Sequence, residues 1–157
     1  MAAHLSRHIV FGEVGGQMLS PAEMLLNLLE VTPQTVDGPA AQGGTTFKSP
    51  TIPRAAFRRA ASDAADFVRR AHRLPNEVFI GSETLSLGDF AATLGGSLDG
   101  GDPIQVVRGN IEFERYFASD GRKPFNWVIH SEGFDGSPLM SLGRLQGWTL
   151  KPARLAR

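Results

Sequence analysis

The sequence predicts an α+β protein in which helix–turn–strand–capped-helix units repeat loosely and an antiparallel β segment lies near the C-terminus. Three observations carry this prediction. A long amphipathic pattern covers residues 54–72, two segments 66 positions apart share the same helix-start pattern, and aromatic residues cluster in the last third between turn signals. Helices grouped apart from antiparallel strands are typical of the α+β class.

The first helix-start pattern lies at residues 15–29. Ser20 is expected to cap a helix, and Pro21 suits the first helical position, where a missing N–H costs nothing. Glu23 falls three residues after the cap, which completes a capping box, while Leu19 and Met24 are spaced to form a hydrophobic staple. We therefore predict a strand and tight turn followed by a short helix here.

The strongest helix pattern covers Arg54–His72 and follows Pro53. Its apolar residues repeat at helical spacing and should form one buried stripe. That stripe is Phe57, Ala60, Ala61, Ala64, Phe67, Val68 and Ala71. The following Arg73-Leu74-Pro75-Asn76 should end the helix, and Glu77–Ile80 reads as a short strand.

The second helix-start pattern matches the first without a gap. Ser86 takes the place of Ser20, and Asp89 takes the place of Glu23. The staple positions are also filled, by Leu85 and Phe90. We predict the same turn and capped helix, ending at the following pair of glycines.

These patterns divide the chain into four segments. Residues 1–31 form a half unit that lacks the long helix, and residues 32–53, rich in Pro, Gly, Thr and Gln, form a linker or surface loop. Residues 54–96 form a full unit, and residues 97–157 a β-rich region with one short helix. The expected C-terminal elements are strands at 104–107, 111–117 and 126–130 and a helix at 137–145.

Composition excludes several classes of protein. Sixteen basic residues balance sixteen acidic ones, which argues against a nucleic-acid binder, and the apolar runs are too short for a membrane span. The absence of cysteine removes disulfides, thiolate metal sites and cysteine nucleophiles. The first residues carry no secretory signal, so the sequence alone defaults to the cytoplasm and leaves the compartment unknown.

Acid–base chemistry has one candidate group. His130 followed by Glu132, with Glu112 and Glu114 on a neighbouring predicted strand, offers a base and a carboxylate partner. His4 and His8 have the spacing of two metal ligands on a helix, but no helical pattern or HExxH motif accompanies them. We expect neither a metal nor a cofactor. The more ordinary interpretation of His130 and its neighbouring glutamates is a histidine at a strand end with solvated acids beside it.

Ligand binding has a different set of candidates. Trp127 and Trp148 are the aromatic residues we expect to be exposed, because flat rings stack on sugar faces. Arg73 and Asn76 follow the long helix and would add hydrogen bonds. The remaining aromatic residues of the last third are expected in the core.

Residues 55–95 resemble the pseudomurein-binding type of cell-wall repeat, and residues 15–29 resemble half of it. The residues that carry the resemblance are Ala64–Val68, Arg73-Leu74-Pro75-Asn76, Val78, Gly81, Leu85-Ser86, Asp89-Phe90 and Leu94. Such repeats occur in surface proteins that bind wall polymers and in enzymes that cut them. The resemblance implies noncovalent attachment to an envelope glycan at the cell surface, and it implies no catalytic residue.

Three functions remain open at this point. The first is a noncatalytic module that binds cell-wall or surface polysaccharide, as an accessory piece of a larger envelope system. The second is a carbohydrate-active enzyme or fragment that uses His130 with a nearby glutamate. The third is a protein–protein interaction module that pairs through an exposed helix at 24–29. Because a half unit leaves apolar surface bare, homo-oligomers are compatible with each.

Overall fold

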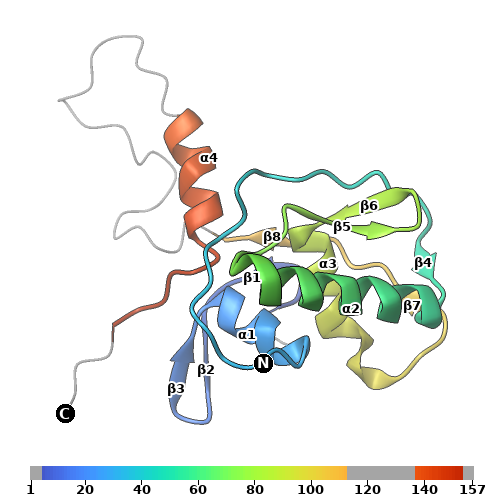
Figure 1. Ribbon diagram of the computed structural model, residues 1–157, viewed down its shortest axis with the longest axis horizontal. Coiled ribbons are helices and arrows are strands. Elements are labelled where there is room, and N and C mark those ends of the chain that lie inside the picture. The colour runs from blue at the N-terminus through green and yellow to red at the C-terminus, as the bar shows by residue number, and fades with distance from the viewer. Residues whose placement is uncertain (1–4, 113–136, 154–157) are drawn as a thin grey trace.

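The computed structural model describes residues 5–112 and 137–153. The chain folds as the predicted α+β protein, with helices and small two-stranded sheets around one core (Figure 1). Its helices are α1 (Pro21–Leu28), α2 (Arg54–Ala71), α3 (Leu87–Gly96), the 3-10 helix η2 (Ser97–Asp99) and α4 (Ser137–Gln146). Its strands are β1 (His8–Ile9), β2 (Gly12–Val14), β3 (Gln17–Leu19), β4 (Thr51–Ile52), β5 (Glu77–Ile80), β6 (Glu83–Ser86), β7 (Ile104–Gln105) and β8 (Asn110–Ile111).

Two hairpin–helix units dominate the architecture. In the first unit, residues 12–28, strands β2 and β3 form a hairpin that leads into α1. In the second unit, residues 77–96, strands β5 and β6 do the same before α3. The sequence predicted one strand before each helix, and β3 and β6 are additional. Their equivalence as copies of a repeat remains a prediction, although their local shapes agree.

The two hairpins turn at equivalent glycines. Gly15 has φ +58 and Gly81 has φ +64, values that glycine adopts without strain. Gly16, the second turn residue of the first hairpin, also has a positive φ of +81. Two-residue loops with such dihedrals suit the twist of antiparallel strands and fix the register of each hairpin.

The long helix α2 lies across the middle of the view in Figure 1, next to the hairpin β5–β6. It buries Phe57, Ala60, Ala64 and Val68, as predicted, and Phe57 lies against Phe90 of α3 with ring centroids 5.5 Å apart. Phe67 and Ala71 were expected in the same stripe, but both are exposed, and Ala65 is buried instead. The buried face is therefore rotated slightly from the predicted one.

Segments far apart in sequence complete the core. Strand β7 pairs antiparallel with β4, while β8 pairs in parallel with β1, so the described C-terminal strands bond to earlier parts of the chain. One hydrophobic cluster contains residues from both units, from residues 32–53 and from the end of the chain. In the described part of the chain, no helix is long and apolar enough to cross a membrane.

Candidate functional site

The predicted acid–base group is only partly described. Glu114, His130 and Glu132 lie outside the described residues, and so does Trp127 of the predicted binding set. Glu112 follows β8, and its Oε1 lies 2.7 Å from Nδ1 of His8 at the start of β1. Glu112 is therefore engaged by a histidine of the neighbouring strand. Among the described residues, no three metal-ligating side chains gather.

Trp148 is not an exposed stacking platform, so that prediction is wrong. Only 4% of the residue is accessible, and its ring belongs to the main core. Its carbonyl accepts a 2.8 Å hydrogen bond from the N–H of Ala22 in the first turn of α1. Trp148 thus fixes the C-terminal segment against the first unit and offers no ring face to a ligand.

Arg73 and Asn76 hold the chain's own extended segment. Asn76 Oδ1 accepts from the N–H of Ala41 at 3.0 Å, and Arg73 Nη2 lies 3.8 Å from Asp37 Oδ2. Asn76 and Trp148 also line one small cavity of about 70 Å³. That volume holds about two water molecules and is too small for a sugar ring.

The exposed helix expected at residues 24–29 is also corrected. Met24 and Leu25 have no accessible surface, and Leu26 and Leu29 are nearly as buried. Together they pack into the core cluster shared with the second unit. Because these side chains are buried, a partner protein cannot bind to this face of the helix.

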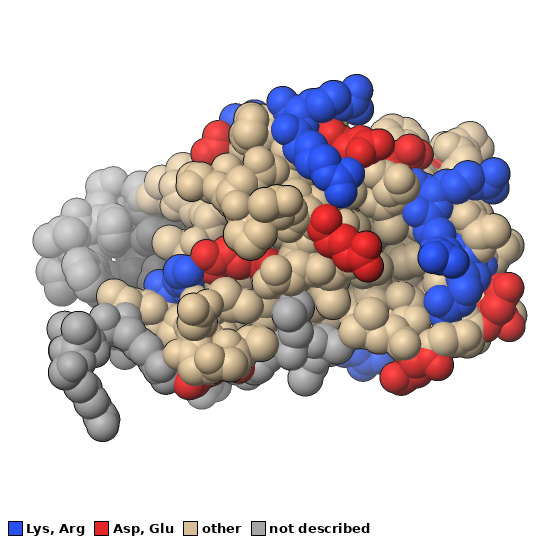
Figure 2. Space-filling view, turned by 60° about the horizontal axis from the view of Figure 1, so that its bottom comes forward, with Lys and Arg blue, Asp and Glu red and all other residues tan. Residues whose placement is uncertain are grey.

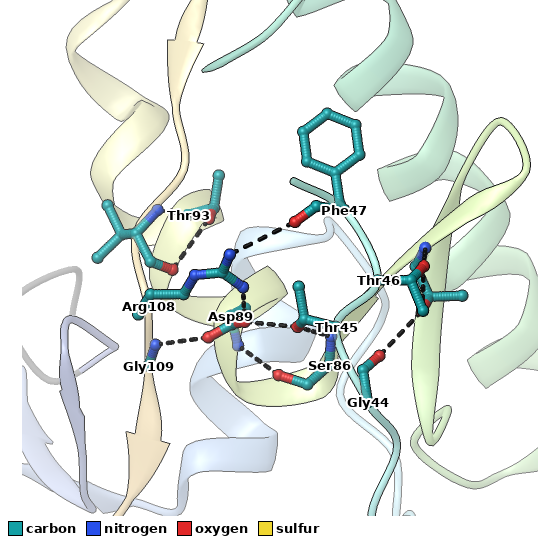
Figure 3. Close-up of polar contacts among 11 residues, drawn as sticks. Gly44, Thr45, Thr46, Phe47, Ser86, Asp89, Thr93, Arg108 and Gly109 are labelled. Atoms are coloured by element: carbon teal, nitrogen blue, oxygen red, sulfur yellow. Dashed lines mark hydrogen bonds and ion pairs between the residues drawn. The ribbon is translucent and has the colours of Figure 1, made fainter. Parts of the chain in front are cut away.

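Asp89, which the sequence identified only as a helix-start acid, is a largely buried carboxylate with partners in two distant segments. It is 7% exposed, and Figure 3 shows it on α3 between residues 44–47 and residues 108–109. Its carboxylate accepts hydrogen bonds from the Thr45 hydroxyl, from Arg108 Nη1 at 2.7 Å and from the Gly109 N–H at 2.9 Å. Asp89 therefore ties α3 to residues 44–47 and to residues 107–109.

The neighbouring backbone is covered by hydroxyl groups. The N–H of Thr84 donates to Thr46 Oγ1 at 2.8 Å, and the N–H of Ser86 donates to Thr45 Oγ1 at 2.7 Å. The Thr84 carbonyl accepts from the N–H groups of Thr46 and Phe47. Residues 44–47 thus lie along the outer edge of β6, and threonine side chains replace part of a strand ladder (Figure 3). The run of glycines and threonines at 43–46 was the available sequence signal.

The first unit carries the corresponding helix-start contacts. The Ser20 N–H donates to Glu23 Oε2 at 2.7 Å, and the Glu23 N–H donates to Ser20 Oγ at 3.2 Å, the predicted capping box. Lys151 Nζ donates to both carboxylate oxygens of Glu23, at 2.6 and 2.8 Å. Partial burial raises the pKa of Glu23, but the hydrogen bonds from Lys151 and Ser20 outweigh it, so the pKa lies below its usual value.

Beside the first unit lies an open groove of about 1290 Å³. Its walls are β3, the first turns of α1, residues 33–36 and residues 149–153. Amide and hydroxyl side chains line it together with apolar ones, including Gln17, Asn27, Gln34 and Thr149. Its volume exceeds that of ordinary small-molecule pockets, which run from about 300 to 1,000 Å³. The described lining therefore offers both hydrogen-bonding and apolar groups to a ligand.

On the face in Figure 2 the larger basic groups lie at the top and on the right with acidic groups beside them, and neutral areas cover most of the rest. On α2, Arg69 Nη1 lies 2.8 Å from Asp66 Oδ1, so part of the basic face of this helix is neutralised.

Comparison of the chain with protein-family models, with curated proteins and with solved structures found no match. The groove and its surroundings are therefore the basis for inferring function.

Proposed function

We propose that this chain is a noncatalytic module that binds cell-wall or surface polysaccharide in the groove beside the first hairpin–helix unit. The observation that carries the proposal is the groove itself, which polar and apolar residues of β3 and α1 line together. Sugar rings present hydroxyl groups at their edges and C–H groups on their faces. Amide side chains and apolar patches match these two surfaces.

Among the described residues that line the groove there are binding groups but no pair of carboxylates. The charged side chains among its described lining residues are Glu23 and Lys151, and each satisfies the other. Hydrolysis of a glycosidic bond ordinarily needs two carboxyl groups across the bond. The single carboxylate here is committed to a helix cap and a lysine, which supports binding over cleavage.

A sedimentation assay with insoluble wall polysaccharide tests this function. Asn27 lines the groove and is exposed, so Asn27→Ala should remove a hydrogen bond to the ligand without disturbing the core. We expect the affinity to fall by about fivefold, which corresponds to about 1 kcal/mol for one hydrogen bond. Gln42→Ala is the matched control, since Gln42 is an exposed amide outside the groove.

The result that contradicts the proposal is equally definite. Wild-type protein that remains in the supernatant with every wall preparation would rule out this function. Equal loss of binding in Asn27→Ala and Gln42→Ala would place the ligand elsewhere. Release of reducing sugar during the assay would favour the carbohydrate-active enzyme over the binding module.

A further inference from the structure

The outer edge of β3 lines the groove, and it can be compared with the outer edge of β6, the equivalent strand of the second unit. In a two-residue hairpin, residues in the second pair from the turn direct their N–H and C=O groups away from the partner strand. Met18 pairs with Glu13 at this position, and Thr84 pairs with Phe79 at the same position in the second unit. Both residues therefore present backbone groups to the outer edge.

The two outer edges are used differently. Thr84 is 7% exposed, and its backbone N–H and C=O are bonded to Thr46 and Phe47. Met18 is only partly buried, it lines the groove, and its backbone makes no corresponding bond to a described residue. The groove thus lies where residues 44–47 would lie if the first unit were covered like the second.

A second pair of positions shows the same difference. The Thr93 hydroxyl in α3 bonds both the N–H and the C=O of Val107, at 3.0 and 3.3 Å, and is fully buried. The equivalent residue of α1 is Asn27, which is exposed and lines the groove. The first unit therefore has polar groups at both equivalent positions, the Met18 backbone and the Asn27 side chain, and both face the groove.

The covering segment of the second unit indicates the chemistry of the missing occupant. Hydroxyl oxygens, from Thr45 and Thr46, accept the edge N–H groups there. A sugar hydroxyl has the same one donor and two acceptor positions as a threonine hydroxyl. An acidic ligand gains nothing, because the one lysine among the described lining residues is already bonded to Glu23.

We infer that the groove takes an uncharged glycan whose hydroxyl groups bond the backbone N–H and C=O of Met18 and the amide of Asn27. This inference rests on the proposed function, and it adds which protein atoms contact the ligand and that the ligand is uncharged. The glycan then occupies on the first unit the place that residues 44–47 occupy on the second.

The test measures backbone amide exchange and affinity with defined soluble probes. The neutral probes are a mannan, a β-1,3-glucan and N-acetylglucosamine oligomers, and the acidic probe is polygalacturonate. With a bound neutral glycan, exchange of the Met18 amide should slow at least tenfold, while that of Thr84 stays unchanged as the internal control. Met18→Pro removes the N–H at an edge where proline is tolerated, and should weaken binding at least tenfold, whereas Met18→Val should not.

Each outcome decides a separate point. If wild-type protein binds a neutral glycan but Met18 exchange is unchanged, the edge assignment is overturned and the proposed function stands. Tighter binding of polygalacturonate than of every neutral probe overturns the ligand class. Protection of Met18 by a peptide with the sequence of residues 43–48, and by no glycan, makes the occupant a polypeptide. Failure to bind any probe or insoluble wall material removes the proposed function itself. The exchange readout uses wild-type protein, so it holds even if Met18→Pro fails to fold.

Discussion

The two hairpin–helix units have the same local structure and different surroundings. Each begins with a glycine turn and a serine cap, and each N3 acid is bonded to a basic residue, Glu23 to Lys151 and Asp89 to Arg108. In the second unit, residues 44–47 also cover the hairpin edge, and Asp89 becomes a buried junction. In the first unit that cover is missing among the described residues, and a groove remains. A shared local pattern therefore serves as internal support at one place and as a candidate binding surface at the other.

The largest expected effect comes from removing the two N3 acids in parallel. Asp89→Ala should lower the free energy of unfolding by about 3 kcal/mol, because three donors lose a largely buried carboxylate. Glu23→Ala should cost about 1 kcal/mol, because it removes one hydrogen bond of the capping box and a half-exposed ion pair with Lys151. Urea denaturation of both variants measures the difference. Equal losses of stability would mean that Asp89 and Glu23 contribute equally to the fold, which would contradict the proposed difference between the two units.

A close backbone contact gives the next effect. A Cβ added at Gly109 would lie 2.4 Å from the Gly88 carbonyl oxygen and 2.6 Å from Ala92 Cβ. Gly109→Ala should therefore destabilise the protein by about 2 kcal/mol through overpacking against α3. Gly44→Ala is the control, since a Cβ there meets no atom within 4 Å. A Gly109→Ala variant with wild-type thermal stability would show that the 107–109 segment does not press on α3.

The third prediction concerns the Thr45 hydroxyl, which links the Asp89 carboxylate to the backbone N–H of the cap residue Ser86. In the first unit the longer Glu23 reaches the Ser20 N–H directly, while in the second Thr45 stands between the Ser86 N–H and Asp89. Thr45→Val should cost about 1.5 kcal/mol by leaving that N–H and part of the carboxylate unsatisfied. Thr45→Ser keeps the hydroxyl and should restore most of the loss in thermal melts. A serine variant as unstable as the valine variant would assign the effect to packing instead.

The smallest effect is the pH dependence of the first unit. The Glu23 pKa lies below its ordinary value of 4.5 in the folded protein, so the ionised carboxylate stabilises the fold above that pH. This contribution is lost as the pH falls through the folded-state pKa. The stability difference between wild type and Glu23→Gln should shrink from pH 7 to pH 3, as measured by urea denaturation. A difference that is constant with pH would show that Lys151 and Ser20 do not favour the charged form.

Local features of the fold were predictable from sequence because they depend on neighbours. The Ser20–Glu23 capping box, the α2 stripe and the second serine cap each need residues within a turn or two of one another. The strands β3 and β6 were missed because three or four residues carry too little alternation to be distinguished from a turn. The α+β class followed from the order of these elements.

The candidate site was not predictable, because long-range contacts define it. Glu23 and Lys151, which both line the groove, are 128 positions apart, and no local rule brings them together. Residue type also misled the prediction at Trp148, where the same large ring that stacks on sugars fills a core equally well. Arg73 and Asn76 were predicted to bind a ligand, and that prediction stays untested, while their described partners belong to residues 37–41 of the same chain.

The most direct test of the central comparison is amide hydrogen exchange in the protein without ligand. Thr84 is covered by residues 46–47, so its N–H should exchange only when that segment opens, with protection close to that of the core. Met18 faces the open groove, and its N–H should exchange nearly as fast as an unprotected amide. Similar protection at Met18 and Thr84 would show that the first unit is covered after all, and would contradict the open groove on which the proposed function rests.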